Sequence, residues 1–290
     1  MPNPVNHTRP LQIRESEDGV IEIYQASGSL LLRYVYKPQT PNDESSRPYL
    51  HPLCTLSGEC LTNFRPNDHR WHHGLSYTIT TLNGNNFWGG PTYKQGSGYV
   101  FNNDHGCQKH IAWTEKSPYH LSHVVHWLSS SRELLLTEER SLEINVVSDS
   151  TWFLRWKSSF KNVSSSQLVL GNYYSSAQLK GSHYSGLQFR GARDLLDEHG
   201  DEKIGISAEG GLKGEESIHA QCVKWVEWSG QKDITQKRIR IRFEDNIKSF
   251  HAFIRKAQSL MAIPFEYDKA MRLDMNSTLH IDNTLTFTDL

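Results

Sequence analysis

A cluster of ionisable side chains in the first third of the chain could do chemistry. The run 66–74 (PNDHRWHHG) holds three imidazoles, one carboxylate and one guanidinium. Histidine donates a proton, accepts one or binds a metal near neutral pH more readily than other side chains do. This density is unusual for a packing segment, and it predicts a site without specifying the reaction.

The histidines of this region allow more than one role. His51 lies upstream of the cluster, and three imidazoles with one open position can hold a catalytic metal. Alternate residues of an extended segment share a face, so His72 and His73 would not ligate one metal from a regular strand. A turn at Asp68 would bring two histidines of the cluster to His51, although the spacing matches no known zinc motif. Metal-free acid/base work or substrate hydrogen bonding is the leading interpretation, and a divalent metal or a structural polar network are the alternatives.

A carboxylate for the same chemistry is offered by the run 137–140 (TEER). On a strand Glu138 and Arg140 share a face, while Glu139 points the other way. A carboxylate inside a groove and beside an arginine could serve as a general base. The alternative is an exposed row of ion pairs, which would contribute little to stability.

Aromatic and amide side chains follow the histidine cluster closely. The segment 82–93 (LNGNNFWGGPTY) is rich in Asn and Gly, and the whole chain holds eight Trp and twelve Tyr. Flat aromatic faces suit the apolar C–H faces of pyranoses, although aromatic rings also fill β cores. We expect catalysis by His51, His69, His72, His73 and Glu138, and substrate contacts from Arg47, Tyr49, Asp68, Asn86, Trp88, Tyr93, Arg140, Tyr184 and Arg190.

The composition excludes several classes of function. The 31 basic and 32 acidic residues are nearly balanced, so the chain has no polycation for a nucleic-acid backbone. No stretch approaches the ~20 apolar residues of a membrane helix, and residues 1–10 lack the apolar core of a signal peptide. Nucleotide-binding glycine loops, a serine-hydrolase elbow and a His-Glu-x-x-His motif are all absent from the sequence. The four Cys lack Cys-x-x-Cys spacing, which favours free thiols in a reducing cytoplasm.

Short β-rich segments separated by turns run through the chain. The clearest pair is 120–128 with 133–147, and a helix is the rival for the second arm because Leu, Glu and Arg are good helix formers. A further antiparallel pair is expected between 152–160 and 167–174, and 194–219 is predicted to be an inserted polar loop. The pattern predicts an all-β fold, a large antiparallel β-sandwich of the supersandwich kind. It would form a single domain over 19–290 behind an N-terminal tail, 1–18.

An ordered series of motifs resembles one known family. The motifs are 47–52 (RPYLHP), the pair Asp68-His69 with 71–75, and 83–93, followed by shorter matches in 134–140, 184–190, 225–230 and 264–266. On these motifs, which span roughly residues 20–288, the chain resembles the uncharacterised bacterial and fungal family labelled methane oxygenase PmoA. Arg70 stands where members of that family commonly have Pro. The resemblance implies carbohydrate metabolism and a functional link to a sugar oxidoreductase.

The leading functional hypothesis is a soluble, cytoplasmic enzyme that acts on a sugar or an oxidised sugar. As an isomerase or lyase it would carry out epimerisation, elimination or hydration beside a carbonyl, with His and Glu as acid and base and with no required cofactor. Its partner would be a small-molecule sugar, and neither a nucleic acid nor a membrane. The alternatives are a non-catalytic carbohydrate-binding β-sandwich and a metal-dependent oxygenase, the activity that the family label suggests.

Overall fold

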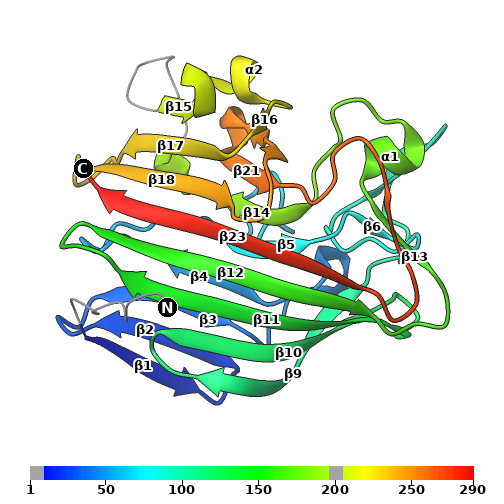
Figure 1. Cartoon of the computed structure of the whole chain (residues 1–290), viewed down its shortest axis with the longest axis horizontal. Helices are drawn as coiled ribbons and strands as arrows, with labels where there is room; N and C mark the ends of the chain where they lie inside the picture. The colour runs from blue at the N-terminus through cyan, green and yellow to red at the C-terminus, as the bar shows by residue number, and fades with distance from the viewer. Residues whose placement is uncertain (1–9, 196–204) are drawn as a thin grey trace.

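Antiparallel strands dominate the protein. The computed structural model describes residues 10–195 and 205–290, and within these the α-helices are the short α1 (Tyr173–Ala177) and α2 (Glu215–Ile218). Two eight-stranded sheets lie one behind the other, as Figure 1 shows. The expected all-β sandwich is confirmed. Across the described part of the chain, no helix has the length and apolar character needed to cross a membrane.

The first sheet joins the two ends of the sequence. Its order is β1-β2-β3-β4-β5-β14-β21-β20, so β14 lies between a strand from the first third and one from the last. All of its pairings are antiparallel. The strands are β1 (Leu11–Ser16), β2 (Val20–Gln25), β3 (Leu30–Val35), β4 (Tyr49–Leu53), β5 (Leu75–Thr78), β14 (Gly186–Arg190), β20 (Phe253–Arg255) and β21 (Leu260–Ile263).

The second sheet is the front layer of Figure 1 and has the order β15-β17-β18-β23-β12-β11-β10-β9. The predicted hairpin at 120–147 forms its β10–β11 pair, so the strand interpretation of 133–147 is confirmed against the helical one. The strands are β9 (Cys107–Lys116), β10 (His120–Leu128), β11 (Leu134–Val146), β12 (Thr151–Asn162), β15 (Gly205–Ala208), β17 (Trp225–Gln231), β18 (Arg238–Asp245) and β23 (Thr278–Asp289).

Smaller elements close the ends of the sandwich. Three short sheets have the orders β22-β13-β6, β16-β19 and β7-β8. Their strands are β6 (Thr81–Leu82), β7 (Thr92–Lys94), β8 (Gly98–Val100), β13 (Leu168–Gly171), β16 (Cys222–Val223), β19 (Phe250–His251) and β22 (Met271–Leu273). The 3-10 turns are η1 (Asn42–Glu44), η2 (Arg193–Leu195), η3 (Glu209–Gly211) and η4 (Lys256–Gln258).

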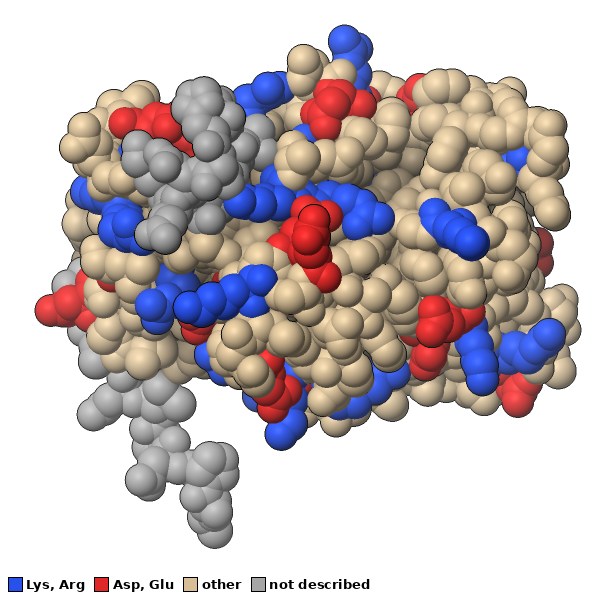
Figure 2. Space-filling model, turned by 90° about the horizontal axis from the view of Figure 1, so that it is seen from above, with Lys and Arg blue, Asp and Glu red and all other residues tan. Residues whose placement is uncertain are grey.

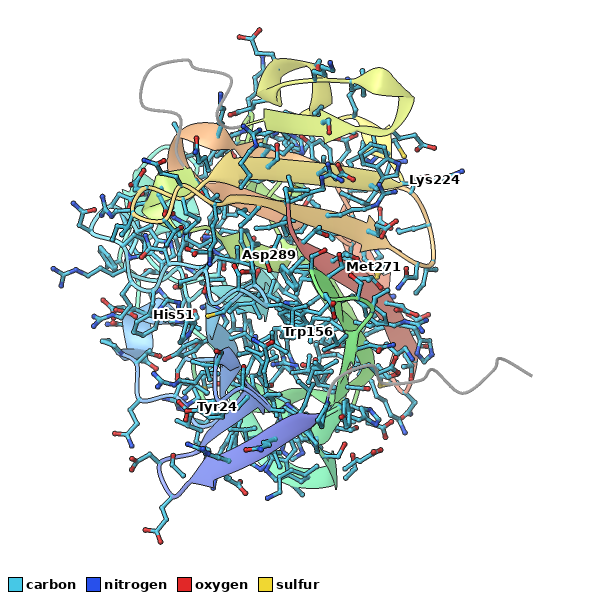
Figure 3. The ribbon with its side chains drawn as sticks, turned by 90° about the vertical axis from the view of Figure 1, so that its left-hand side faces the viewer. Tyr24, His51, Trp156, Lys224, Met271 and Asp289 are labelled. Atoms are coloured by element: carbon cyan, nitrogen blue, oxygen red, sulfur yellow. The ribbon has the colours of Figure 1, made fainter. Side chains whose placement is uncertain are left out.

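The main core lies between the two large sheets. On β12 the burial alternates along the strand, and Trp152, Leu154 and Trp156 are fully buried while the residues between them reach the outer face. Figure 3 shows Trp156 between the two layers. On the face seen in Figure 2, side chains of both charge signs are scattered with no block of one sign, as the balanced composition predicts.

Three expectations about elements are wrong. Residues 11–16, within the expected tail, form β1, because Leu11 is buried and the segment pairs with β2; residues 1–9 of the tail lie outside the described residues. The segment 167–174 does not pair with β12: β13 pairs with β22 and β6, and α1 begins at Tyr173 with Asn172 as its N-cap. The expected loop 194–219 contains β15 and α2, and its residues 196–204 lie outside the described residues.

The outer face of the first sheet carries a second, smaller apolar cluster. Along β21, Met261 packs into the main core, whereas Leu260 packs on the opposite side with Phe253 and the ring of Tyr184. Arg190 of β14 is the cross-strand partner of Leu260, so the two side chains share this outer face. Polar side chains on this face are therefore held by a rigid sheet and lie outside the main core.

Candidate active site

A pocket of about 500 Å³ opens on the outer face of the first sheet. Strands β20 and β21 contribute its floor, and the loops before β5, before β7 and before β14 contribute its walls. The residues lining the pocket are His69, Trp71, His72, Trp88, Gly89, Pro91, Tyr99, Gly181, Ser182, Tyr184, Phe253, Arg255, Gln258 and Leu260.

Aromatic rings form much of the pocket wall. The ring centroids of Trp88 and Tyr184 are 4.5 Å apart, and the hydroxyls of Tyr184 and Tyr99 are 3.2 Å apart. Trp71 packs on two glycines, since a Cβ on Gly90 would lie 2.4 Å from its indole ring. The Trp-Gly-Gly sequence is therefore required for the two indoles to line one pocket.

The turn that presents Trp88 depends on Asn86. This side chain is buried, and its Oδ1 accepts hydrogen bonds from the backbone N–H groups of Trp88 and Gly89, at 2.9 and 2.8 Å. Its Nδ2 donates to the Gly90 carbonyl and to Thr92 Oγ1. Asn86, which we expected to bind substrate, instead fixes the backbone that carries an indole of the pocket.

Arg190 connects two histidines beneath the pocket. Its Nη2 donates to both carboxylate oxygens of Asp68, at 2.9 and 2.8 Å, and its Nη1 donates to Nδ1 of His72 at 3.1 Å. Asp68 in turn accepts from Nδ1 of His69 at 2.9 Å. The two imidazole rings stack with centroids 4.9 Å apart. One guanidinium therefore positions both rings.

These contacts give the two histidines opposite hydrogen-bonding roles. A guanidinium can only donate, so His72 Nδ1 is an acceptor and a neutral His72 carries its proton on Nε2. A carboxylate can only accept, so Nδ1 of a neutral His69 carries the proton and its Nε2 presents a lone pair. Nε2 of His72 is buried and has no hydrogen-bond partner among the described residues. The pair therefore combines one unused donor with one unused acceptor.

Burial and charge fix the ionisation of this group. Hydrogen bonds from Arg190 and His69 outweigh the opposing effect of burial and lower the pKa of the Asp68 carboxyl to about 2, so it is ionised at neutral pH. Burial, reinforced by the charge of Arg190, holds the pKa of His72 well below its usual range, so His72 is neutral. His72 is only 1% exposed, whereas the side chain of His69 is 31% exposed.

His51 and His73 lie outside the pocket. His73 is fully buried and donates from Nε2 to Glu44, whose charge is balanced by Arg65 at 2.7 Å. His51 bonds Thr62 through Nδ1 at 2.9 Å and stacks on Phe64. In Figure 3, His51 and Trp156 lie on opposite sides of the first sheet. The predicted convergence is confirmed for His69 and His72 and is wrong for these two residues, whose rings support the loop before β5.

Glu138 and Arg140 lie in the core between the sheets. They share a face of β11, as predicted, and both are fully buried, with an Nε–Oε1 distance of 2.8 Å. Trp127 Nε1 and Ser158 Oγ donate to the carboxylate, and Arg140 reaches Gln108 at 2.8 Å. Neither residue lines the pocket, so the expectation that Glu138 is a catalytic base within reach of the histidines is wrong. The pair forms a buried structural network.

Three other expected substrate contacts are structural. Arg47 is fully buried and donates to the backbone carbonyls of Glu44, Ser45 and Trp71, and burial lowers its pKa to about 9. Tyr49 is buried and stacks on Phe64, and Tyr93 packs edge-on against Tyr99. Trp88, Tyr184, Asp68 and Arg190 are the expected substrate contacts that the structure places in or directly beneath the pocket.

Sequence reasoning missed several pocket residues. Trp71 belongs to the histidine run but was not named as a site residue; its ring meets that of His72 edge-on, with the centroids 6.2 Å apart. Tyr99, Ser182, Arg255 and Gln258 lie in segments without a dense motif. Cross-strand pairing of β14, β21 and β20 brings Arg255 to this face, and no local spacing reveals that pairing. Among the described residues, no group of three or more His, Cys, Asp or Glu is placed to hold a metal ion.

Comparisons with known proteins place the sequence in one family. A family model described as "Family of unknown function (DUF6807)" matches residues 24–289. No curated protein matches the chain. The expected family, the one labelled methane oxygenase PmoA, is therefore wrong, because the model that matches nearly the whole chain is a different one and carries no such label.

Solved structures give distant likenesses. A putative aldose 1-epimerase from Escherichia coli K12 is 9% identical, with a TM-score of 0.39, over 97% of this chain and 100% of the other. A GalM/aldose epimerase homologue from C. elegans is 8% identical, with a TM-score of 0.36, over 98% of this chain and 99% of the other.

Proposed function

We propose that this chain, which belongs to the DUF6807 family of unknown function, is an enzyme that transfers protons to and from a bound sugar. As an isomerase or lyase it would carry out epimerisation, elimination or hydration. The observation that supports the proposal is the Asp68–Arg190 pair, whose carboxylate and guanidinium hold His69 and His72 in opposite hydrogen-bonding roles at one aromatic pocket.

His69 is the proton acceptor in this proposal. Its ring lines the pocket and is accessible, its Nδ1 is held by the ionised Asp68, and its Nε2 has no partner among the described residues. A carboxylate that orients an imidazole in this way also stabilises the imidazolium that forms when the ring takes a proton. His69 can therefore remove a proton from a substrate hydroxyl or from a carbon beside a carbonyl.

His72 is the hydrogen-bond donor of the pair: because the ring is neutral, its Nε2–H can polarise a substrate oxygen while the proton itself moves through His69. Its Nε2–H is left without a partner, which is costly for a buried polar group unless a ligand completes it. The stacked rings present acceptor and donor from neighbouring positions, so His69 can remove and return a proton while His72 stabilises the charge that develops on a neighbouring oxygen. Epimerisation, elimination and hydration beside a carbonyl each require that combination.

The pocket wall supports a sugar as the substrate. Trp71, Trp88 and Tyr184 offer apolar ring faces, and Ser182 and Gln258 offer polar groups beside them. A volume of about 500 Å³ lies in the range of small-molecule sites and accommodates a monosaccharide. The four free cysteines support a reducing compartment such as the cytoplasm. We propose no required cofactor, and a chelator tests the alternative of a divalent metal.

Turnover in heavy water tests the proposal. The purified protein is incubated in D2O with a panel of aldoses, keto-sugars produced by oxidation, and sugar acids, and proton NMR follows anomer interconversion, loss of C–H signals and new alkene signals. The expected result is catalysis on at least one sugar, reduced about 10²–10⁴-fold in the His69→Gln variant. His126→Gln is the matched control, since His126 lies on β10 and does not line the pocket.

Three outcomes would contradict the proposal. Undiminished turnover by His69→Gln would remove the acid/base role. Sugar binding by the wild type without turnover of any panel member would favour the non-catalytic carbohydrate-binding alternative. Turnover lost to a chelator and restored by a divalent cation would favour the metal-dependent alternative.

A further inference from the structure

Arg255 brings a positive charge into the pocket. It is the last residue of β20 and the cross-strand partner of Leu260, which is also the partner of Arg190 on the other side of β21. Residues paired across neighbouring strands share a face, and two strand spacings separate the backbones of Arg190 and Arg255 by about 10 Å. The histidine pair and Arg255 therefore approach one pocket from positions on opposite sides of Leu260.

The charge of Arg255 has no counterpart in the lining of the pocket. Arg255 is the one Lys or Arg, and no Asp or Glu is present, among the described residues that line it. Arg190 is already matched by Asp68 at 2.8 Å. Glu215 Oε1 lies 3.8 Å from Arg255 Nη1, which is longer than a hydrogen bond, and Glu215 does not line the pocket.

The guanidinium is held by neutral groups that leave one edge open. Its plane lies over the Phe253 ring, 4.5 Å from the centroid; Nη1 donates to the Ile254 carbonyl at 2.9 Å and Nη2 to the Gly181 carbonyl at 2.8 Å. His219 contacts Nη1, and burial together with the Arg255 charge lowers its pKa to about 4, so it adds no charge at neutral pH. Nε has no partner among the described residues.

We propose that the substrate is a sugar acid whose carboxylate docks on Arg255, an inference that rests on the proposed function of the same pocket. A planar carboxylate accepts two parallel hydrogen bonds from one edge of a guanidinium, and the held, partly exposed Arg255 offers Nε and Nη2 for this purpose, on the edge away from Glu215. One cation in a lining without carboxylates matches the single charge of a carboxylate. The neutral hydroxyls of the sugar would lie between Arg255 and the histidine pair.

Affinity measurements on matched sugars test the proposal. Titration calorimetry compares D-glucuronate and D-galacturonate with D-glucose and D-galactose, and includes D-glucose 6-phosphate as a different anion. The wild type is expected to bind a uronate at least about tenfold more tightly than its neutral parent, with a preference that weakens as salt rises. Arg255→Gln is expected to remove that preference, because it weakens uronate binding far more than binding of the neutral sugar.

Controls separate this proposal from the others. Arg255→Lys keeps the charge and loses the planar fork, so intermediate affinity is expected. Arg238→Gln removes an exposed arginine of β18 and should change nothing. Four results would overturn the sugar-acid proposal. The wild type could bind uronate and parent sugar equally, bind the phosphate more tightly than the uronate, or bind no sugar at all. Alternatively, Arg255→Gln could weaken the binding of both sugars equally. If the wild type shows no uronate preference but turns over neutral sugars, the sugar-acid proposal fails and the proposed function stands. If the wild type prefers uronates but His69→Gln is as active as the wild type, the proposed function fails and the sugar-acid proposal stands.

Discussion

Asp68 acts through His69, and its charge can be removed with little change in shape. In Asp68→Asn the amide can donate to the ring, so the Nδ1–H tautomer of His69 is no longer enforced, and Arg190 loses its ionic partner. We expect the turnover number to fall by about 10²–10⁴-fold, with a much smaller change in the Michaelis constant. Steady-state kinetics on the sugar identified by NMR measures both.

Asn67→Asp is a suitable comparison at the adjacent position, because Asn67 bonds Arg193 and does not contact either histidine in the described structure. Its turnover should stay within about twofold of the wild type, as expected for a change at an exposed side chain. An Asp68→Asn enzyme as active as Asn67→Asp would show that the carboxylate has no part in the chemistry.

Some residues of the pocket could be predicted from the sequence, and others could not. Asp68, His69 and His72 were identifiable because three polar side chains with proton-transfer chemistry stand close together in the chain. His73 has the same side chain and adjacent position, yet it is buried against Glu44. Residue type alone cannot distinguish the two, because the turn at residues 66–72 decides which ring meets Arg190.

At the element scale, β11 carries the buried Glu138–Arg140 pair into the space between the sheets. Removing one partner of such a pair leaves an uncompensated buried charge, which typically costs about 3–5 kcal/mol. Arg140→Leu is therefore expected to lower the free energy of unfolding by about that amount, measured by urea denaturation. The folded variant should keep its turnover, because neither residue lines the pocket.

The comparison is Arg155→Leu on the neighbouring β12. Arg155 pairs with Asp282 at 2.6 Å, but its side chain is 36% exposed, so the loss should be below about 1 kcal/mol. If both variants lose the same stability, the network around Glu138 does not contribute as its burial indicates. Loss of turnover by well-folded Arg140→Leu would restore the role in catalysis that the sequence suggested.

Strand existence was easier to predict than strand pairing. The 120–147 hairpin was correct because its two arms adjoin one short turn. In contrast β9, with the sequence CQKHIAWTEK, was not predicted, because it is an edge strand whose exposed residues are largely polar. The β5–β14–β21–β20 order pairs segments that are distant in sequence, such as Leu75 with Phe189, so the sheet face that holds Arg190 and Arg255 could not be deduced from local patterns.

At the scale of the whole molecule, neutral buried histidines make stability depend on pH. Burial lowers the pKa of several histidines, to about 4 for His51, His73, His110 and His219, and well below its usual range for His72 and His123. An unfolded histidine titrates near pH 6.5. Below that value the unfolded chain binds protons that the folded protein does not, so their contribution is complete above about pH 6.5 and is lost as the pH falls towards 4.

We therefore expect the melting temperature to fall steadily between pH 6.5 and 4.5, as differential scanning calorimetry would record. The carboxylates with lowered pKa, Asp68 and Glu44, act in a different window: their contribution persists to about pH 4 and is lost only below it. His73→Gln should reduce the slope between pH 6.5 and 4.5, whereas His126→Gln should not. A melting temperature that is flat across this range would contradict the assignment of neutral, buried rings.

The tautomers of His69 and His72 test the central claim most directly. In protein labelled with ¹⁵N in histidine only, long-range ¹⁵N–¹H correlation spectra distinguish a ring protonated on Nδ1 from one protonated on Nε2. At pH 7.5 His72 is expected to carry its proton on Nε2, and a neutral His69 is expected to carry it on Nδ1. His72 should still be neutral at pH 6.5, where a free imidazole is half protonated. Signals are assigned by His69→Gln and His72→Gln; Asp68→Asn should release the Nδ1–H tautomer of His69, and Arg190→Leu should release the Nε2–H tautomer of His72. The same tautomer on both rings of the wild type, or tautomers that survive both substitutions, would contradict a histidine pair set by Asp68 and Arg190.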